Sequence, residues 1–244
     1  MANRKLHLRI RKMHRYLGLI LGIQFLFWTI SGLYFSWTNI DEIHGDFQHK
    51  HPPTLKADFH LISPDSILQK LKPDFINSFQ IVSILQQPFY SINYSKAKET
   101  KLILANAQTG AIRMPVAKDE AVNIAAESFN SEPKLVSAEY ITSANAHHEY
   151  RGKPLPAWAV TFDHPSNTTV YVSAERGMVE TFRNNKWRLF DFLWMGHVMG
   201  YQERDNINNW LLRFFSLFGL ITVISGFALF FVSNRFFKRN KIYQ

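Results

Sequence analysis

The sequence contains no cysteine and few charged residues. Without cysteine the chain has no disulfide, no thiolate metal site, no iron–sulfur cluster and no covalently attached c-type haem. Charged residues make up only 19% of the 244 residues, whereas aromatic residues reach 15%. Paired carboxylates, a glycine-rich phosphate loop and a nucleophile motif are missing as well. Hydrolysis therefore has no visible machinery, and whether the chain is an enzyme stays open.

Acidic residues are absent from both ends of the chain, and this explains its net charge of +9. Residues 1–37 carry six basic residues and residues 211–244 carry five, without an acidic residue in either segment. The remaining 17 basic and all 19 acidic residues lie in residues 38–210. Because the positive excess is confined to short end segments, we expect contact with anionic lipid and no nucleic-acid partner.

Two long uncharged runs adjoin these basic ends, at residues 16–37 and 214–232. A helix of about 20 apolar residues spans the roughly 30 Å hydrocarbon core of a bilayer. We therefore expect transmembrane helices at 16–37 and 210–232. The positive-inside rule then places both termini in the cytoplasm and residues 38–210 outside it. The first run is too long for a signal-peptide core and no small-residue cleavage site follows it, which favours a retained anchor.

Small and polar residues in the first span suggest how it packs. Gly18 and Gly22 form a small-residue pair that permits close helix approach. The pair predicts packing between the two spans of one chain or, as the alternative, a homodimer seam. Gln24 is the one strongly polar side chain in mid-span, and we expect it to hydrogen-bond to the second span.

The segment between the spans contains a weak internal repeat, residues 63–116 and 117–184. Each copy opens with a helical apolar pattern, continues through two strand-like runs and reaches an Ala-x-x-Gly turn, where glycine supplies a positive φ. The turns run from Ala107 to Gly110 and from Ala174 to Gly177. We predict an α+β domain of two helix-plus-antiparallel-meander repeats.

These residues resemble a known family. The helix DEAVNIAAESF, the strand PAWAVTF and the hairpin TVYVSAERGMVE resemble a PepSY domain. The ends resemble the PepSY-associated transmembrane family through three motifs: His14-Arg15-Tyr16-Leu17-Gly18, Ser31-Gly32 and Ser225-Gly226. The resemblance implies a bacterial inner-membrane protein with a periplasmic PepSY domain. Larger, four-helix members are similar to haem-containing ferrisiderophore reductases, which implies a role in ferric iron or ferrisiderophore reduction during iron uptake.

The expected organisation combines these features, with an amphipathic segment before the second span. Trp187, Phe190, Trp194, His197 and Tyr201 fall on one helical stripe, which predicts a helix in the outer interface with its aromatic face in lipid. The expected parts are a basic tail at 1–15, a span at 16–37, a linker at 38–62, repeats at 63–116 and 117–184, an interfacial segment at 187–209, a span at 210–232 and a basic tail at 233–244.

Three histidines near the membrane boundaries are candidate ligands of a b-type haem, because membrane-level ionisable residues are functional candidates. They are His14 at the inner end of the first span, His44 beyond its outer end and His197 before the second span. Haem iron accepts two axial imidazoles from opposite faces. His44 and His197 could share an iron, whereas His14 lies about 30 Å away across the hydrocarbon. An inner haem would need His14 from two protomers or a different subunit.

Each histidine also has a plainer interpretation. His14 could contact lipid headgroups, His197 could be an interfacial residue, and His44 could belong to a hydrated linker. Residues 41–51 around His44 offer oxygen and nitrogen ligands but no closed zinc spacing, so no metal site is predicted. His147-His148-Glu149 is expected at a loop tip.

A second function class is a membrane-anchored periplasmic binding module. In this alternative the spans only anchor the chain, and the middle domain grips a protein or peptide partner. It predicts an exposed apolar groove or sheet edge and no cofactor.

Overall fold

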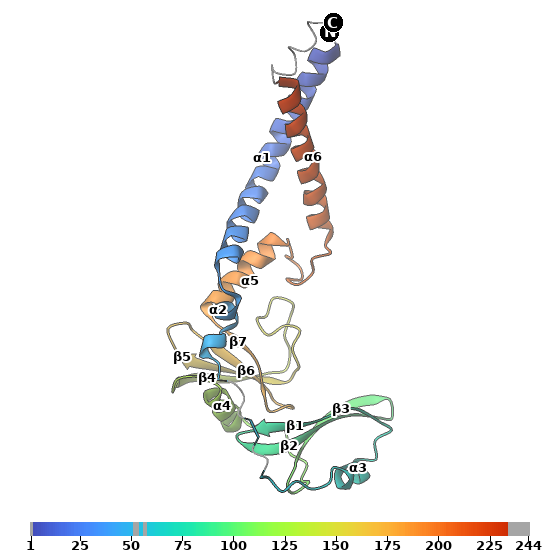
Figure 1. Ribbon diagram of the computed structural model, residues 1–244, viewed down its shortest axis with the longest axis vertical. Coiled ribbons are helices and arrows are strands. Elements are labelled where there is room, and N and C mark those ends of the chain that lie inside the picture. The colour runs from blue at the N-terminus through green and yellow to red at the C-terminus, as the bar shows by residue number, and fades with distance from the viewer. Residues whose placement is uncertain (1, 51–53, 56–57, 234–244) are drawn as a thin grey trace. The chain divides into compact units, whose positions relative to one another are not determined.

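The computed structural model describes residues 2–50, 54–55 and 58–233. They divide into two compact units: Met1–Thr38 with Phe190–Gln244, and Asn39–Leu189. The first unit is helical and the second is a helix-and-sheet domain (Figure 1). The predicted basic tail at 233–244 lies outside the described residues, except for Ser233.

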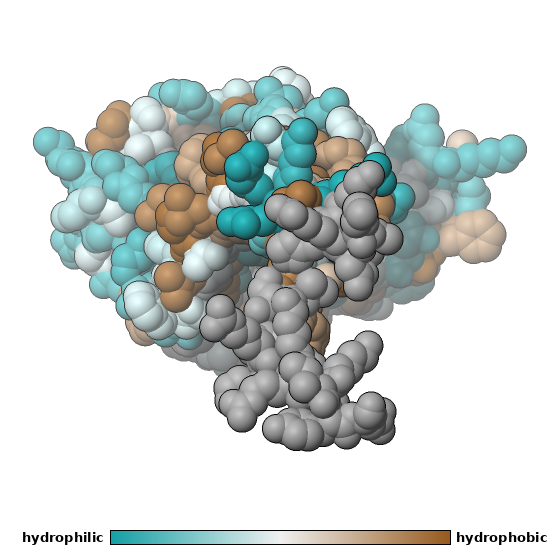
Figure 2. All heavy atoms as spheres, turned by 90° about the horizontal axis from the view of Figure 1, so that it is seen from above, coloured by the Kyte–Doolittle hydropathy of each residue, from teal (hydrophilic) through white to brown (hydrophobic). Residues whose placement is uncertain are grey.

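The helical unit contains two long apolar helices, α1 (Ala2–Trp37) and α6 (Trp210–Ser233), each long and apolar enough to cross a membrane. Leu19 and Ile23 of α1 are 72% and 77% exposed, so much of the apolar surface is free to face lipid. The expected tail at 1–15 is helical from Ala2 onward, because it holds no helix breaker and several good helix formers. In Figure 2, seen from above, hydrophilic and hydrophobic spheres lie side by side on the visible face.

Glycines of α6 allow it to approach α1 closely. A Cβ atom at Gly219 would lie 3.2 Å from the Phe25 ring, and one at Gly226 would lie 3.3 Å from the His14 ring. At Gly18 and Gly22, in contrast, no atom lies within 4 Å of such a position. Neither glycine is therefore needed for a tight contact in this structure, and their role in helix packing stays a prediction.

Helix α5 (Asn185–His197) packs its aromatic side chains on α1. The centroid of the Phe35 ring lies 4.9 Å from that of Phe190 and 6.1 Å from that of Trp194. This part of the aromatic stripe therefore faces α1, whereas the sequence predicted that it would face lipid. Gln24 likewise donates to the Gly196 carbonyl of α5, at 3.4 Å, and not to the second span.

The predicted stripe is also shorter than expected, because α5 ends at His197. Met199 adopts a left-handed φ of 54°, and the Gly200 N–H returns to the Met195 carbonyl at 2.9 Å. Such a bond closes the C-terminal end of a helix. Tyr201 therefore lies beyond α5 and is 50% exposed.

The domain contains two antiparallel sheets, of order β1-β2-β3 and β4-β5-β6-β7. Each sheet follows a helix in the chain, which confirms an α+β domain between the two apolar helices. The linker holds α2 (Ile40–His44) and a 3₁₀ turn (Asp46–Gln48). The remaining elements are α3 (Asp65–Leu71), β1 (Phe75–Ile84), β2 (Gln87–Lys96), β3 (Glu99–Asn106), α4 (Lys118–Glu127), β4 (Lys134–Ile141), β5 (Ala157–Asp163), β6 (Thr169–Ser173) and β7 (Val179–Arg183).

The two halves of the domain share a set of loop-closing hydrogen bonds. In each half a fully buried alanine follows a strand, β3 in the first half and β6 in the second. Its N–H donates to a proline carbonyl, and its own carbonyl accepts from a residue that precedes α3 or α4 in the chain. The bonds are Ala107 to Pro88 and Ala174 to Pro156, both 3.0 Å, and Ile62 to Ala107 and Val116 to Ala174, at 2.9 and 2.8 Å.

Glycine closes each of these turns with a positive φ. Gly110 (φ 71°) donates to the Asn106 carbonyl at 2.8 Å, and Gly177 (φ 61°) donates to Ser173 at 2.9 Å. A Cβ atom at either glycine would lie 2.7 Å from an isoleucine methyl group. Both the backbone conformation and the close packing therefore favour glycine.

One hydrophobic core joins the two halves. Ile84, Leu104 and Val116 of the first half are buried together with α4 and the second sheet. The first half also has a small core of its own, in which Ile67 of α3 packs against Tyr90 and Ile92 of β2. The halves consequently form one domain although their elements repeat.

Candidate functional site

Two predicted site residues, His14 and His197, each form a hydrogen bond with a serine of a neighbouring helix. His14 Nδ1 lies 2.8 Å from Ser225 Oγ of α6, and His197 Nδ1 lies 2.7 Å from Ser31 Oγ of α1. Both serines belong to the Ser-Gly pairs noted in the sequence. Both contacts are histidine–serine hydrogen bonds. In the first α1 supplies the histidine, and in the second α1 supplies the serine.

The serine hydrogen bonds engage the Nδ1 atom of each imidazole. Ser225 Oγ donates to the Thr222 carbonyl at 2.7 Å, and Ser31 Oγ donates to the Phe27 carbonyl at 2.8 Å. In the tautomer that carries its proton on Nδ1, each histidine donates to the serine oxygen. The lone pair of that neutral tautomer lies on Nε2, which is the nitrogen that a metal-bound histidine commonly offers.

His197 lies in an aromatic and partly buried environment. The Trp28 indole donates to the His197 carbonyl at 2.6 Å, and the Phe35 ring centroid lies 5.5 Å from the imidazole. Burial lowers the pKa of His197, so its imidazole is neutral at pH 7. The geometry and the protonation state both suit a metal-ligating or haem-ligating imidazole.

The two histidine contacts lie far apart. His14 and Ser31, the partner of His197, are 17 residues apart on one continuous helix, which corresponds to about 26 Å along the axis. His14 and His197 of one chain therefore cannot share an iron, as expected.

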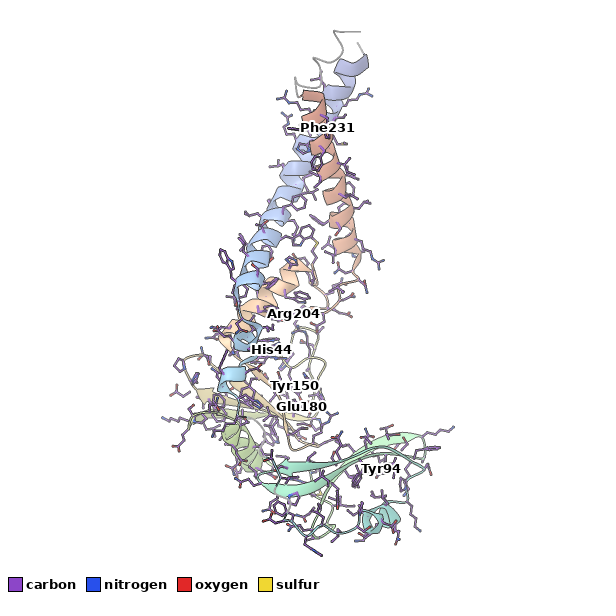
Figure 3. The ribbon with its side chains drawn as sticks, viewed as in Figure 1. His44, Tyr94, Tyr150, Glu180, Arg204 and Phe231 are labelled. Atoms are coloured by element: carbon purple, nitrogen blue, oxygen red, sulfur yellow. The ribbon has the colours of Figure 1, made fainter. Side chains whose placement is uncertain are left out.

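His44 lies in the other unit. It is exposed at the C-terminal end of α2 (Figure 3), and its role stays a prediction. Across residues 2–50, 54–55 and 58–233 no group of three or more His, Asp or Glu side chains could hold a metal ion. His51 of the predicted ligand-bearing segment lies outside the described residues.

Glu149 has a structural role that sequence reasoning missed. It lies in the loop between β4 and β5, as predicted, but its carboxylate accepts from Arg188 Nε at 2.7 Å and from the Tyr171 hydroxyl at 2.7 Å, so it is tied to the domain and not free at a loop tip. Burial, with the nearby Glu149 charge, raises the pKa of Tyr171, which keeps the phenol a donor. The sequence carries no signal for this contact, because Arg188 lies 39 residues further along the chain.

A pocket of about 530 Å³ lies in the domain beside α2 and the His164–Ser166 turn. His164 Nδ1 accepts from the Ser166 backbone N–H at 3.2 Å and lies 2.6 Å from Ser166 Oγ. Ser166 Oγ also contacts Gln48 Nε2 at 2.8 Å and Thr168 Oγ1 at 2.7 Å. These bonds stabilise the turn. Ser166 Oγ and His164 Nδ1 are both used in them, so the pair has a structural role here.

Comparison with known proteins gives no further assignment of the site. No protein-family model matches the chain, and no curated protein or solved structure is significantly similar to it.

Proposed function

We propose that the chain is an inner-membrane PepSY protein that carries b-type haem and serves electron transfer, or an accessory role, in the reduction of ferric iron or a ferrisiderophore. The observation that carries this proposal is the pair of histidine–serine contacts. Both histidines contact a serine of a Ser-Gly motif through Nδ1, so Nε2 is the nitrogen that would ligate iron. The resemblance to the PepSY-associated transmembrane family supports the same assignment.

Each contact offers one imidazole that would hold a haem iron. His197 is the proposed ligand on the periplasmic side, and the role of His44, which lies in the other unit, stays a prediction from the sequence. His14 is the proposed ligand of an inner haem, completed by a second protomer or another subunit. Haem, when bound, supplies one-electron chemistry at its iron. The chain's own residues orient the imidazoles through Ser31 and Ser225 and keep water from His197 with Trp28 and Phe35.

A reduced-minus-oxidised absorption spectrum tests the haem proposal directly. The full chain, expressed with haem supplied and purified in detergent, is expected to show the Soret and α bands of a b-type haem. A protein that folds and remains free of both bands would contradict the haem proposal. Haem released by acid extraction would confirm non-covalent attachment, which the absence of cysteine requires.

A membrane-anchored binding module remains the second candidate, because the domain contains an apolar groove of about 150 Å³ between its halves. Ile84, Ile124 and Met178 are among the residues that line it. The Ser83 hydroxyl nearby is buried and has no hydrogen-bond partner among the described residues. A single apolar side chain of a peptide, followed by a backbone group that bonds the hydroxyl, would fit this groove.

The Met178→Trp variant tests the groove. Met178 lines the groove and is 44% exposed, so a larger side chain is expected to fill the groove without unfolding the domain. Binding of a peptide selected from a display library on the full chain should weaken by about tenfold or more, as expected for a blocked hot-spot pocket. The control is Met114→Trp at an 81% exposed position, which should bind as the original chain does. Equal binding by both variants would exclude the groove as the peptide site.

A further inference from the structure

Arg204 is a mostly buried cation in the segment that joins α5 to α6. Its side chain is 22% exposed, and Nη1 donates to the carboxylate of Asp191 on α5, which is 3% exposed. The Nε atom of Arg204 is buried and has no hydrogen-bond partner in the part of the chain that the structure describes. Buried donors are almost always paired, because an unpaired one has lost its water without a replacement. The guanidinium therefore offers one donor, Nε–H, to an acceptor from outside the described chain.

Arg204 lies beside the last two turns of α5, close to the proposed haem ligand His197. A Cβ atom at Gly200 would lie 3.0 Å from the Arg204 carbonyl oxygen, so the Arg204 backbone returns to a point three residues beyond His197. Asp191, which binds the guanidinium, precedes His197 by six residues, or about 9 Å along the helix. The Arg204 side chain, labelled in Figure 3, therefore extends along α5 from the His197 end toward Asp191.

The backbone acceptors at this end of α5 already have donors. The His197 carbonyl accepts from the Trp28 indole at 2.6 Å, and the Val198 carbonyl accepts from Asn209 Nδ2 at 2.8 Å. These bonds fix the end of α5 against α1 and against the start of α6. They also leave the Arg204 Nε–H to an acceptor that a bound molecule would supply.

The chemistry of haem matches such a donor beside an imidazole. A b-type haem carries two propionate groups, which are carboxylates at the edge of an apolar macrocycle. A guanidinium binds a carboxylate through charge-assisted hydrogen bonds that are stronger than neutral ones. Arg204 and Arg213 are the only basic residues between 198 and 232 in the sequence. Arg213 is exposed, so Arg204 is the one with a buried donor.

We propose that Arg204 is a haem-binding residue, which donates from Nε to a propionate of the haem that His197 would ligate. Its Nη1 stays on Asp191, which orients the guanidinium and balances its charge before haem binds. The inference rests on the proposed function, because it requires a haem at His197. A haem without free carboxylates would keep the bond between iron and imidazole and lose the hydrogen bond to Arg204.

Two forms of haem test this proposal: haem b and its dimethyl ester, in which both propionates are esterified. The full chain is purified in detergent without haem and carries His14→Ala, so that only the haem at His197 is titrated. The measured quantity is the dissociation constant of the ester divided by that of haem b, obtained from the Soret absorbance. Partition into detergent is the same for every variant, so it cancels when these ratios are compared. Arg204→Gln is expected to lower the ratio by about tenfold or more, as for the loss of a hydrogen bond between charged groups.

Two further variants separate propionate binding from a general effect on the fold. Arg213→Gln removes an exposed arginine of the same segment and should leave the ratio unchanged. Arg204→Lys keeps the charge but not the planar fork, so it should lower the ratio less than Arg204→Gln does. Near-ultraviolet circular dichroism of each variant shows whether the fold is intact. If Arg204→Gln does not fold, a lowered ratio is still expected for Arg204→Lys.

Equal ratios in the original chain and in both Arg204 variants would overturn the inference. This holds even if Arg204→Gln weakens the binding of both haems, because equal weakening indicates a structural role only. Binding of neither haem by the original chain would instead contradict the proposed function, and this inference with it. Failure of the inference alone is therefore distinguishable from failure of the proposed function.

Discussion

Replacement of His197 by alanine is expected to abolish the signal of the proposed haem at this residue in the full chain. His197 is the one imidazole of α5, and its Nδ1 contacts Ser31, so Nε2 is the nitrogen that would ligate the iron. Alanine offers no ligand, so the b-type bands that belong to this haem should disappear from the reduced-minus-oxidised spectrum. The measurement is the absorbance of haem per protein chain, compared with that of the unchanged protein.

Two matched variants distinguish ligation from a general loss of structure. His60→Ala removes an exposed histidine of the domain and should leave the spectrum unchanged. Ser31→Ala keeps the ligand but removes the oxygen that accepts from Nδ1, and loss of such a supporting partner typically weakens binding by about 10–100-fold. A His197→Ala protein that keeps its full haem content would remove His197 from the site.

Replacement of Phe129 by alanine is expected to destabilise the domain more than any surface change. Phe129 is 1% exposed, and its ring lies 5.2 Å from Phe162 and 5.5 Å from Phe182 in the core that joins the two halves. Truncation of a buried phenylalanine costs about 3–5 kcal/mol because it removes buried apolar area and leaves a cavity. For a domain of this size the melting temperature should fall by roughly 6–20 °C.

The control for this variant is Phe47→Ala, which removes the same side chain at a 63% exposed position of the same unit. Its melting temperature should change little. Thermal unfolding of the full chain, followed by near-ultraviolet circular dichroism, measures both variants. Similar melting temperatures for the two would mean that Phe129 is not in the shared core.

Hydropathy predicts α1 and α6 because a bilayer requires a long continuous apolar run, a property of neighbouring residues alone. The repeat is visible for a similar reason, since Gly110 and Gly177 mark turns whose conformation is local. Strand β1 was not predicted, because its exposed apolar residues on both faces give no clean alternation of apolar and polar positions.

The candidate site was predictable in its residues and not in its contacts. The His-Arg-Tyr-Leu-Gly and Ser-Gly motifs identify His14 and Ser225, but these residues are 211 positions apart. Only the packing of α6 on α1 brings them within hydrogen-bond distance. The same limit applies to Gln24, because no local pattern indicates that its partner belongs to α5 rather than to α6.

The loop-closing bonds of the first half have a consequence for the order of folding. The bond from Ile62 to Ala107 and the turn at Gly110 need no residue beyond Ala111. Synthesis proceeds from the N-terminus, and segments generally fold as they become complete. The first sheet with α3 can therefore form its own small core around Ile67 while the second sheet is still being made, and the shared core is completed afterwards.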